Sequence, residues 1–172
     1  MNTKKRTNPT EMTFTARLSK WITGMYWSIF VFLIFMLVAV PLLAEMSPWE
    51  KVLFLAVFLA VLAMFIFIML KAYRMRFTIE KNRIIVSGVF KENRIKISDI
   101  KSIDKGPIPA GIRLFGASFL GGLYYLPGIG KAWVTMGNFQ DGVLISTKKG
   151  KHYVITPQEP LKFIQIVKKK ME

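Results

Sequence analysis

Two long runs of residues without charge dominate the first 70 positions of the chain. The first covers residues 21–44 and the second residues 52–70. As helices they would measure about 36 Å and about 28 Å, against a hydrocarbon core of about 30 Å. A cleaved signal sequence is the alternative for the first run, but the apolar core of a signal usually has about 7 to 15 residues. We therefore predict a transmembrane hairpin over residues 21–70, with one helix in each run.

The charges that flank the two runs indicate an orientation. Residues 1–20 hold five basic residues and one acidic residue, and five more basic residues follow between 71 and 83. The connecting segment 45–51 has two glutamates and one lysine. The positive-inside rule then predicts a protein of the cell membrane with two spans and both termini in the cytoplasm. Neither run contains an ionisable residue, so a transporter is not expected.

From residue 73 onward the pattern changes to short runs that alternate apolar and polar side chains. Residues 75–79 and 83–87 flank a polar turn, as in a hairpin. Five further strands are predicted at residues 95–97, 100–103, 131–137, 142–147 and 152–155. Thr156 is the expected N-cap of a last helix, with Pro157 at its first position. Residues 73–172 are therefore predicted to form a split barrel of about seven antiparallel strands, closed by a C-terminal α-helix.

Several stretches of this region resemble a known family. Residues 76–79, 84–90 and 97–103 are similar to the start of the bacterial pleckstrin-homology-like (PH-like) domains that are attached to membrane hairpins. Residues 116–125, 141–145 and 153–157 resemble one of those families in particular. The resemblance implies a cytoplasmic PH-like domain over residues 73–172. Its motifs are structural glycines and apolar pairs, so it implies a fold and no functional residues.

The segment 106–130 departs most from a plain barrel. It holds seven of the twelve glycines, three prolines and one charged residue, Arg113. We expect a Gly-rich apolar insertion without clear secondary structure, too apolar to remain disordered. Three interpretations are open: it completes the barrel core, it lies at the bilayer interface or against the hairpin, or it lines a ligand pocket. In the second interpretation Tyr124, Tyr125 and Trp133 are amphipathic anchors.

The charge of the chain points to an anionic partner. The 25 lysines and arginines exceed the 10 aspartates and glutamates, and residues 71–172 alone carry 19 basic against 7 acidic residues, a formal charge of +12. For a tethered domain the nearest anion is the phospholipid of the cytoplasmic leaflet. Nucleic acid is not expected, because exposed aromatics do not interleave the strands. The candidate membrane or ligand surface comprises Arg113, Phe115, Tyr124, Tyr125, Lys131, Trp133, Lys148, Lys149 and Lys151.

Residues suited to catalysis are few. The chain has no cysteine and a single histidine, His152, which stands apart from any histidine or cysteine partner. A phosphate loop is excluded around Lys131, because Tyr125 and Ala132 occupy positions that the pattern reserves for glycine and for serine or threonine. We predict no cofactor, no metal and no enzymatic activity. The expected function is binding of lipid headgroups, a peptide or a protein partner at the membrane. The alternative is a scaffold subunit of a homo-oligomer or a larger membrane complex.

Overall fold

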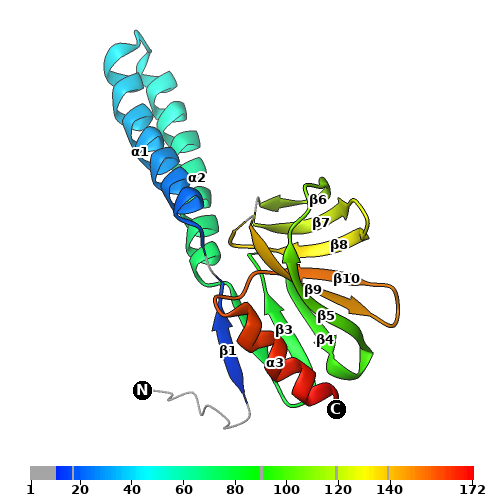
Figure 1. The fold of residues 1–172 in the computed structure, drawn as a ribbon. Helices are drawn as coiled ribbons and strands as arrows, with labels where there is room; N and C mark the ends of the chain where they lie inside the picture. Colours follow the sequence, from blue (N-terminus) through cyan, green and yellow to red (C-terminus); the bar gives the residue numbers. More distant parts are fainter. Residues whose placement is uncertain (1–10, 17, 90, 119, 139) are drawn as a thin grey trace, which may run out of the picture.

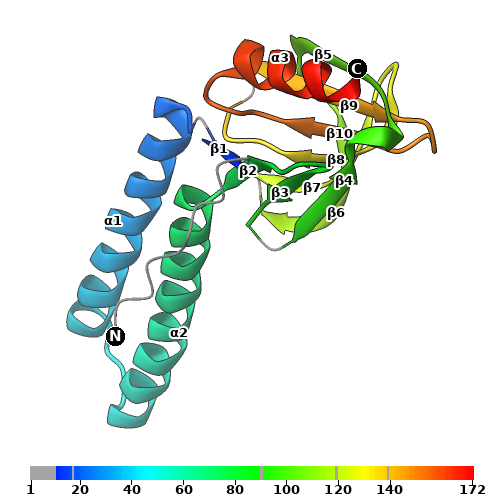
Figure 2. The ribbon, with the colours of Figure 1, turned by 90° about the horizontal axis from the view of Figure 1, so that it is seen from below.

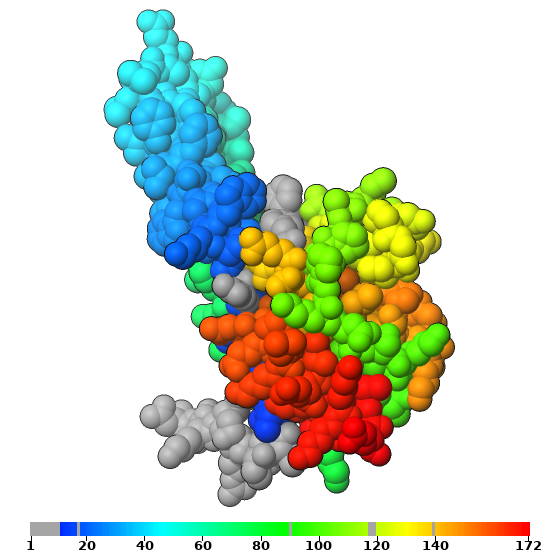
Figure 3. Space-filling model, in the orientation of Figure 1, coloured from blue at the N-terminus to red at the C-terminus, as the bar shows by residue number. Residues whose placement is uncertain are grey.

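A helical hairpin rises from one corner of a β-rich domain in the computed structural model (Figures 1 and 3). The structure describes residues 11–16, 18–89, 91–118, 120–138 and 140–172. Two long apolar helices, α1 (Lys20–Leu43) and α2 (Pro48–Tyr73), form the hairpin. Ten strands and the C-terminal helix α3 (Pro160–Met171) are present in the described residues. The two-part architecture agrees with the one predicted.

Both hairpin helices are long and apolar enough to span a membrane. Their 24 and 26 residues correspond to about 36 Å and about 39 Å. Only 6% of the most apolar window of each helix is buried, so these are not core helices of the β-rich domain. Helix α2 begins four residues earlier than predicted, because Ser47 and Glu50 form a capping box and Pro48 takes the first helical position.

The first sheet contains an unexpected strand. Its antiparallel order is β1 (Met12–Thr15), β2 (Arg76–Ile79), β3 (Arg83–Ser87) and β4 (Glu92–Lys96). We predicted β2, β3 and the end of β4, but treated residues 1–20 as a separate basic segment. Residues 12–15 instead pair with β2, from Met12 opposite Ile79 to Thr15 opposite Arg76. Residues 1–10 and 17 of that segment lie outside the described residues.

The hairpin is consequently an insertion between two paired strands. Strand β1 leads into α1, and α2 leads almost directly into β2. Ala16 donates its backbone N–H to the carbonyl of Met75 at 3.2 Å, which continues the pairing to the base of the helices. The two ends of the hairpin are therefore held side by side, and both lie on the same side of any membrane that the hairpin spans.

The second sheet has six strands and includes the Gly-rich segment. Its order is β5, β9, β10, β8, β7, β6. The bounds are β5 (Ile100–Pro107), β6 (Ile112–Ser118), β7 (Gly121–Leu126), β8 (Gly130–Thr135), β9 (Asp141–Thr147) and β10 (His152–Ile155). Two expectations were wrong here: residues 106–130 form the β6–β7 hairpin rather than an irregular loop, and β8 pairs with β10 in parallel.

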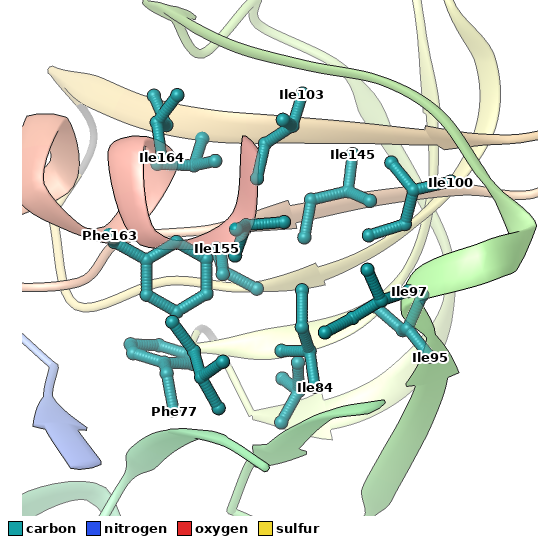
Figure 4. Packing of buried hydrophobic residues seen from close by; sticks show 14 of the residues in the cluster. Phe77, Ile84, Ile95, Ile97, Ile100, Ile103, Ile145, Ile155, Phe163 and Ile164 are labelled. Atoms are coloured by element: carbon teal, nitrogen blue, oxygen red, sulfur yellow. The ribbon is translucent and has the colours of Figure 1, made fainter. Parts of the chain in front are cut away.

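The main core lies between the two sheets and under α3 (Figures 2 and 4). Phe163 of α3 is fully buried, and its ring meets that of Phe14 edge to face at 5.3 Å between centroids. Figure 4 shows Phe77 beside Phe163, with isoleucines from both sheets filling the space beyond. Helix α3 contacts β5, β9 and the short 3-10 turn Ile97–Asp99, so it covers the open end of the barrel as predicted.

Helix α3 begins later than the sequence pattern indicated. Its N-cap is Glu159 and Pro160 is at its start, in place of Thr156 and Pro157. Thr156 is buried, and its hydroxyl accepts a hydrogen bond from the backbone N–H of Gly137 at 2.7 Å. Thr156 therefore does not cap the helix but links the segment before α3 to the loop after β8. The next residues extend toward β1, where Pro157 bridges Ala16.

Phe163 provides a direct test of this core. Phe163→Ala is expected to lower the free energy of unfolding by about 3 to 5 kcal/mol, because it leaves a cavity beside Phe14. The control is Leu161→Ala on the exposed face of the same helix, with an expected effect of about 0.5 kcal/mol or less. The free energy of unfolding of both variants can be measured by urea unfolding of the full chain in detergent, with protease digestion used to detect the unfolded fraction. Equal losses in the two variants would contradict the packing described.

Candidate membrane-facing site

The base of the hairpin packs against two turns of the β-rich domain. Ile22 and Tyr26 of α1 are buried in one apolar cluster with Val89 of the β3–β4 turn and Leu120 of the β6–β7 turn. Phe65 of α2 joins the cluster from the other helix, with its ring 5.7 Å from that of Tyr26. The contact therefore reaches from Ile22 to Tyr26, which lies more than one helical turn beyond Lys20 in the apolar part of the hairpin.

A hydrogen bond strengthens this junction. The backbone N–H of Ser19 donates to the carbonyl of Gly137 at 2.7 Å, and the Ser19 hydroxyl caps α1 by accepting from Ile22. The loop after β8 is thereby joined to the first residue of the hairpin. Together with the β1–β2 pairing, this contact holds the domain in a defined position against the helices.

One face of the β6–β8 region closes a second, smaller core. Leu126, Ala132, Val134, Met136 and Val154 are buried together on the outer side of the six-stranded sheet. Ile108, from the stretch before β6, and the half-buried Tyr124 pack against them. Part of the Gly-rich segment therefore completes a core, but this core is separate from the barrel core that the first of the three interpretations named.

Four other side chains of the β6–β7 hairpin are large, exposed apolar groups. We call Ile112, Leu114, Phe115 and Tyr125 the apolar strip. Ile112 and Phe115 are each 72% exposed, and Ile112 lies directly opposite Tyr125 in the strand register. Several large apolar side chains gathered on one edge hairpin are unusual for a surface that faces water alone. In Figure 3 this green and yellow region lies at the end of the domain from which the hairpin rises.

A pocket of about 350 Å³ opens beside the strip. It lies between the β3–β4 turn, the β6–β7 hairpin and the strand β8. The residues that line it are Gly88, Val89, Lys91, Asn93, Phe115, Gly116, Gly121, Gly122, Trp133, Val134 and Thr135. The Lys91 ammonium lies 3.9 Å from the centroid of the Trp133 ring. Such a cation–π contact contributes about 0.5 to 1 kcal/mol at an exposed site and directs the charge over the ring.

Two glycines in this pocket are required by the backbone. Gly116 and Gly122 have φ angles of 131° and 151° and lie opposite each other where β6 and β7 change register. A Cβ atom on Gly122 would collide with the Phe115 carbonyl, and one on Gly116 would collide with the backbone of Gly121 and Gly122. The close approach of the two strands and the hollow beside them thus depend on the absence of side chains.

The family assignment follows from the domain just described. A family model described as Bacterial PH domain matches residues 75–171, which is 97 of the 172 residues. The chain belongs to the bacterial PH domain family. The resemblance noted in the sequence is thereby confirmed. A search of curated proteins gave no match. The pocket and the apolar strip of this PH domain lie at the end from which the hairpin rises.

The predicted surface residues divide among three places on the PH domain. Phe115 and Trp133 line the pocket, and Tyr125 belongs to the strip with Lys131 opposite it on β8. Arg113 lies opposite Tyr124, whose side chain packs on the outer core. The β9–β10 turn lies at the end remote from the hairpin in Figures 1 and 2, and its sequence contains Lys148, Lys149 and Lys151.

Two lysines of the β9–β10 turn have side-chain partners within the domain. The Lys148 ammonium donates to the carbonyl of Ser98 at 2.8 Å, and the Lys149 ammonium is 3.5 Å from the Asp99 carboxylate. Both contacts tie the turn to the 3-10 turn after β4. Lys91, by contrast, was not singled out from the sequence, since a lone lysine in a turn carries no pattern that marks it.

The polar side chains on β9 and β10 form a cross-strand pair. Ser146 Oγ and His152 Nδ1 lie 3.0 Å apart on directly opposed residues. Next to His152, burial raises the pKa of the Tyr153 phenol above its usual value. Within the described ranges, no three histidine, cysteine, aspartate or glutamate side chains are grouped to hold a metal.

A substitution at Gly122 can test whether the close approach of β6 and β7 forms this site. Gly122→Ala is expected to loosen the β6–β7 hairpin, because the new methyl group would meet the Phe115 carbonyl in a conformation that costs about 1 to 3 kcal/mol. Hydrogen exchange of the β6 and β7 amides should accelerate about tenfold or more. Gly106→Ala is the control, since a Cβ there meets open space. Unchanged exchange in Gly122→Ala would contradict the strand geometry.

Proposed function

We propose that this chain is a non-enzymatic integral membrane protein of two spans whose cytoplasmic PH domain binds at the membrane surface. The observation that carries the proposal is the position of the apolar strip at the hairpin end of the domain. Leu120, at the turn between β6 and β7, packs among residues of both apolar helices. The strip on the same two strands is therefore held near the level at which the helices enter the bilayer.

The cytoplasmic orientation rests on the charges around the hairpin. Basic residues lie just before α1 and just after the apolar part of α2. The short connection between the two helices carries none, and the next basic residue is Lys51 in α2. Because β1 pairs with β2, the two flanks share one side of the membrane, and their positive charges act together. The positive-inside rule assigns that side to the cytoplasm.

The charge of the PH domain favours the lipid bilayer as the occupant of this surface. Residues 71–172 carry a formal charge of +12, and each lysine or arginine near an anionic leaflet contributes about 1 kcal/mol. Exposed apolar side chains such as those of the strip can insert into the headgroup region of a bilayer. The unpaired backbone N–H and C=O groups of a sheet edge can form hydrogen bonds with the polar headgroups there. The net charge of the domain and the exposed apolar strip therefore both favour a lipid bilayer as the partner.

A scaffold function is the second candidate. Strand β6 is at the edge of the six-stranded sheet, with one side free of a strand partner in the described residues. A strand from another protein or from a second copy could add to that edge and cover the strip. In this case the strip would be protected by protein rather than by lipid, which the experiments below distinguish.

The orientation can be tested with single cysteines, since the natural chain has none. Glu45→Cys, in the connection between the helices, is expected to react with a membrane-impermeant maleimide in intact cells. Lys151→Cys, in the β9–β10 turn, should react only after the cells are opened. Both side chains are exposed, so accessibility within the protein does not separate them. Labelling of residue 151 in intact cells would refute the cytoplasmic placement.

Contact between the strip and lipid can be tested at Ile112. Ile112→Cys carrying an environment-sensitive fluorophore, in full-length protein reconstituted into vesicles, should emit at shorter wavelength and be quenched by nitroxide lipids. The same fluorophore on Lys151→Cys should show neither effect. Quenching at residue 112 no stronger than at residue 151 would exclude insertion of the strip. A blue shift without lipid quenching would support the scaffold function, because it indicates burial against protein.

A further inference from the structure

The pocket beside Trp133 touches the junction between the PH domain and the hairpin. Val89 lines the pocket and is also buried in the cluster with Ile22, Tyr26 and Leu120. The side chain of Val89, in the β3–β4 turn, is therefore common to the pocket and to the junction with the helices. If the hairpin spans the bilayer and the strip enters its surface, the pocket lies at the depth of the headgroups. The inference below rests in this way on the proposed function.

The charge in this pocket is unbalanced. Lys91 forms no ion pair with any residue that the structure describes, and its ammonium group lies over the ring of Trp133. None of the described residues that line the pocket is acidic. The ring occupies one side of the ammonium group and leaves N–H donors on the other sides. Asn93, on β4, adds an amide to the same wall.

The shape of the pocket limits what it can hold. Four of the eleven described lining residues are glycines, and the remaining wall consists largely of apolar groups that include Phe115 and Trp133. A volume of about 350 Å³ is at the small end of the range for ligand pockets. It suits one phosphate with its attached glycerol, while two acyl chains would have to remain outside. An occupant with its chains in the neighbouring bilayer meets this condition.

We infer that this pocket binds the phosphate of one anionic phospholipid, with Lys91 as its cationic ligand. The phosphodiester accepts hydrogen bonds from the Lys91 ammonium, which the Trp133 ring holds in position. Asn93 offers a further donor, and the glycine-lined hollow admits the glycerol. A lipid is favoured over a soluble phosphate because the hairpin keeps the pocket at the membrane, where the effective concentration of headgroups is high. The lipid would then act as a third contact between domain and bilayer, besides the hairpin and the strip.

Binding can be measured on the full-length protein by native mass spectrometry from detergent. The probes are phosphatidylglycerol, phosphatidylcholine and soluble glycerol 3-phosphate, titrated separately. The wild type is expected to retain one phosphatidylglycerol in preference to phosphatidylcholine. Lys91→Gln should weaken that retention about tenfold or more, the effect expected for loss of one hydrogen bond to a charged group. Lys91→Arg should preserve it, because a guanidinium also stacks on Trp133 and binds phosphate.

A matched control separates a specific site from general electrostatics. Lys101→Gln removes the same charge from an exposed position on β5 that does not line the pocket, and it should bind like the wild type. Equal binding by wild type and Lys91→Gln, or equal losses in Lys91→Gln and Lys101→Gln, would overturn the inference. Glycerol 3-phosphate bound as tightly as the lipid would overturn the choice of a lipid as the source of phosphate.

The two proposals can fail independently. The fluorophore at residue 112 should report the same lipid quenching in the wild type and in Lys91→Gln, because the strip does not depend on the lysine. Quenching with no preference for phosphatidylglycerol would leave the surface-binding function intact and reject the lipid site. Absence of lipid quenching at residue 112 would reject binding of the strip at the membrane surface, on which the proposed lipid site depends.

Discussion

The pairing of β1 with β2 is the constraint on which the arrangement of this protein depends. The two strands are separated in the sequence by the entire helical hairpin, yet they match residue for residue from Met12 opposite Ile79 to Thr15 opposite Arg76. A transmembrane hairpin joined to a domain by one flexible linker would leave that domain free to rotate. Here both ends of the hairpin enter the same sheet, so the orientation of the PH domain is coupled to that of the helices.

This coupling explains why the end of the domain near the helices differs from the rest. Val89 and Leu120, from two turns of the PH domain, are buried against α1 and α2, and the Ser19 N–H bonds to the Gly137 carbonyl. A domain held in this way keeps the same strands at the end near the helices. Exposed apolar side chains on β6 and β7 can then serve one surface, whereas on a freely rotating domain they would promote aggregation.

The Gly-rich segment contributes both to a buried core and to an exposed apolar surface, and its composition does not show which residues do which. Leu126 and Ile108 face the outer core, while Phe115 and Tyr125 remain exposed on the strip. Strand alternation sends neighbouring residues to opposite faces, so one stretch of sequence contributes to a core and to a surface. The glycines permit the close strand approach that leaves room for the pocket. The same small side chains are a sign of irregular structure when only the sequence is read.

The amino-acid sequence by itself determined the features that depend on local pattern. The two uncharged runs indicated the helices, because a helix that spans a bilayer needs a continuous apolar run. The alternation around Phe77, Ile84 and Ile145 indicated strands, because a half-buried strand alternates apolar and polar residues. The tertiary structure alone decided which distant segments meet. In the folded chain the four residues of β1 pair with β2, Lys91 lies over Trp133, and the basic β9–β10 turn lies far from the hairpin. Such contacts depend on strand order and register between segments far apart in the chain, and no local pattern of residues encodes them.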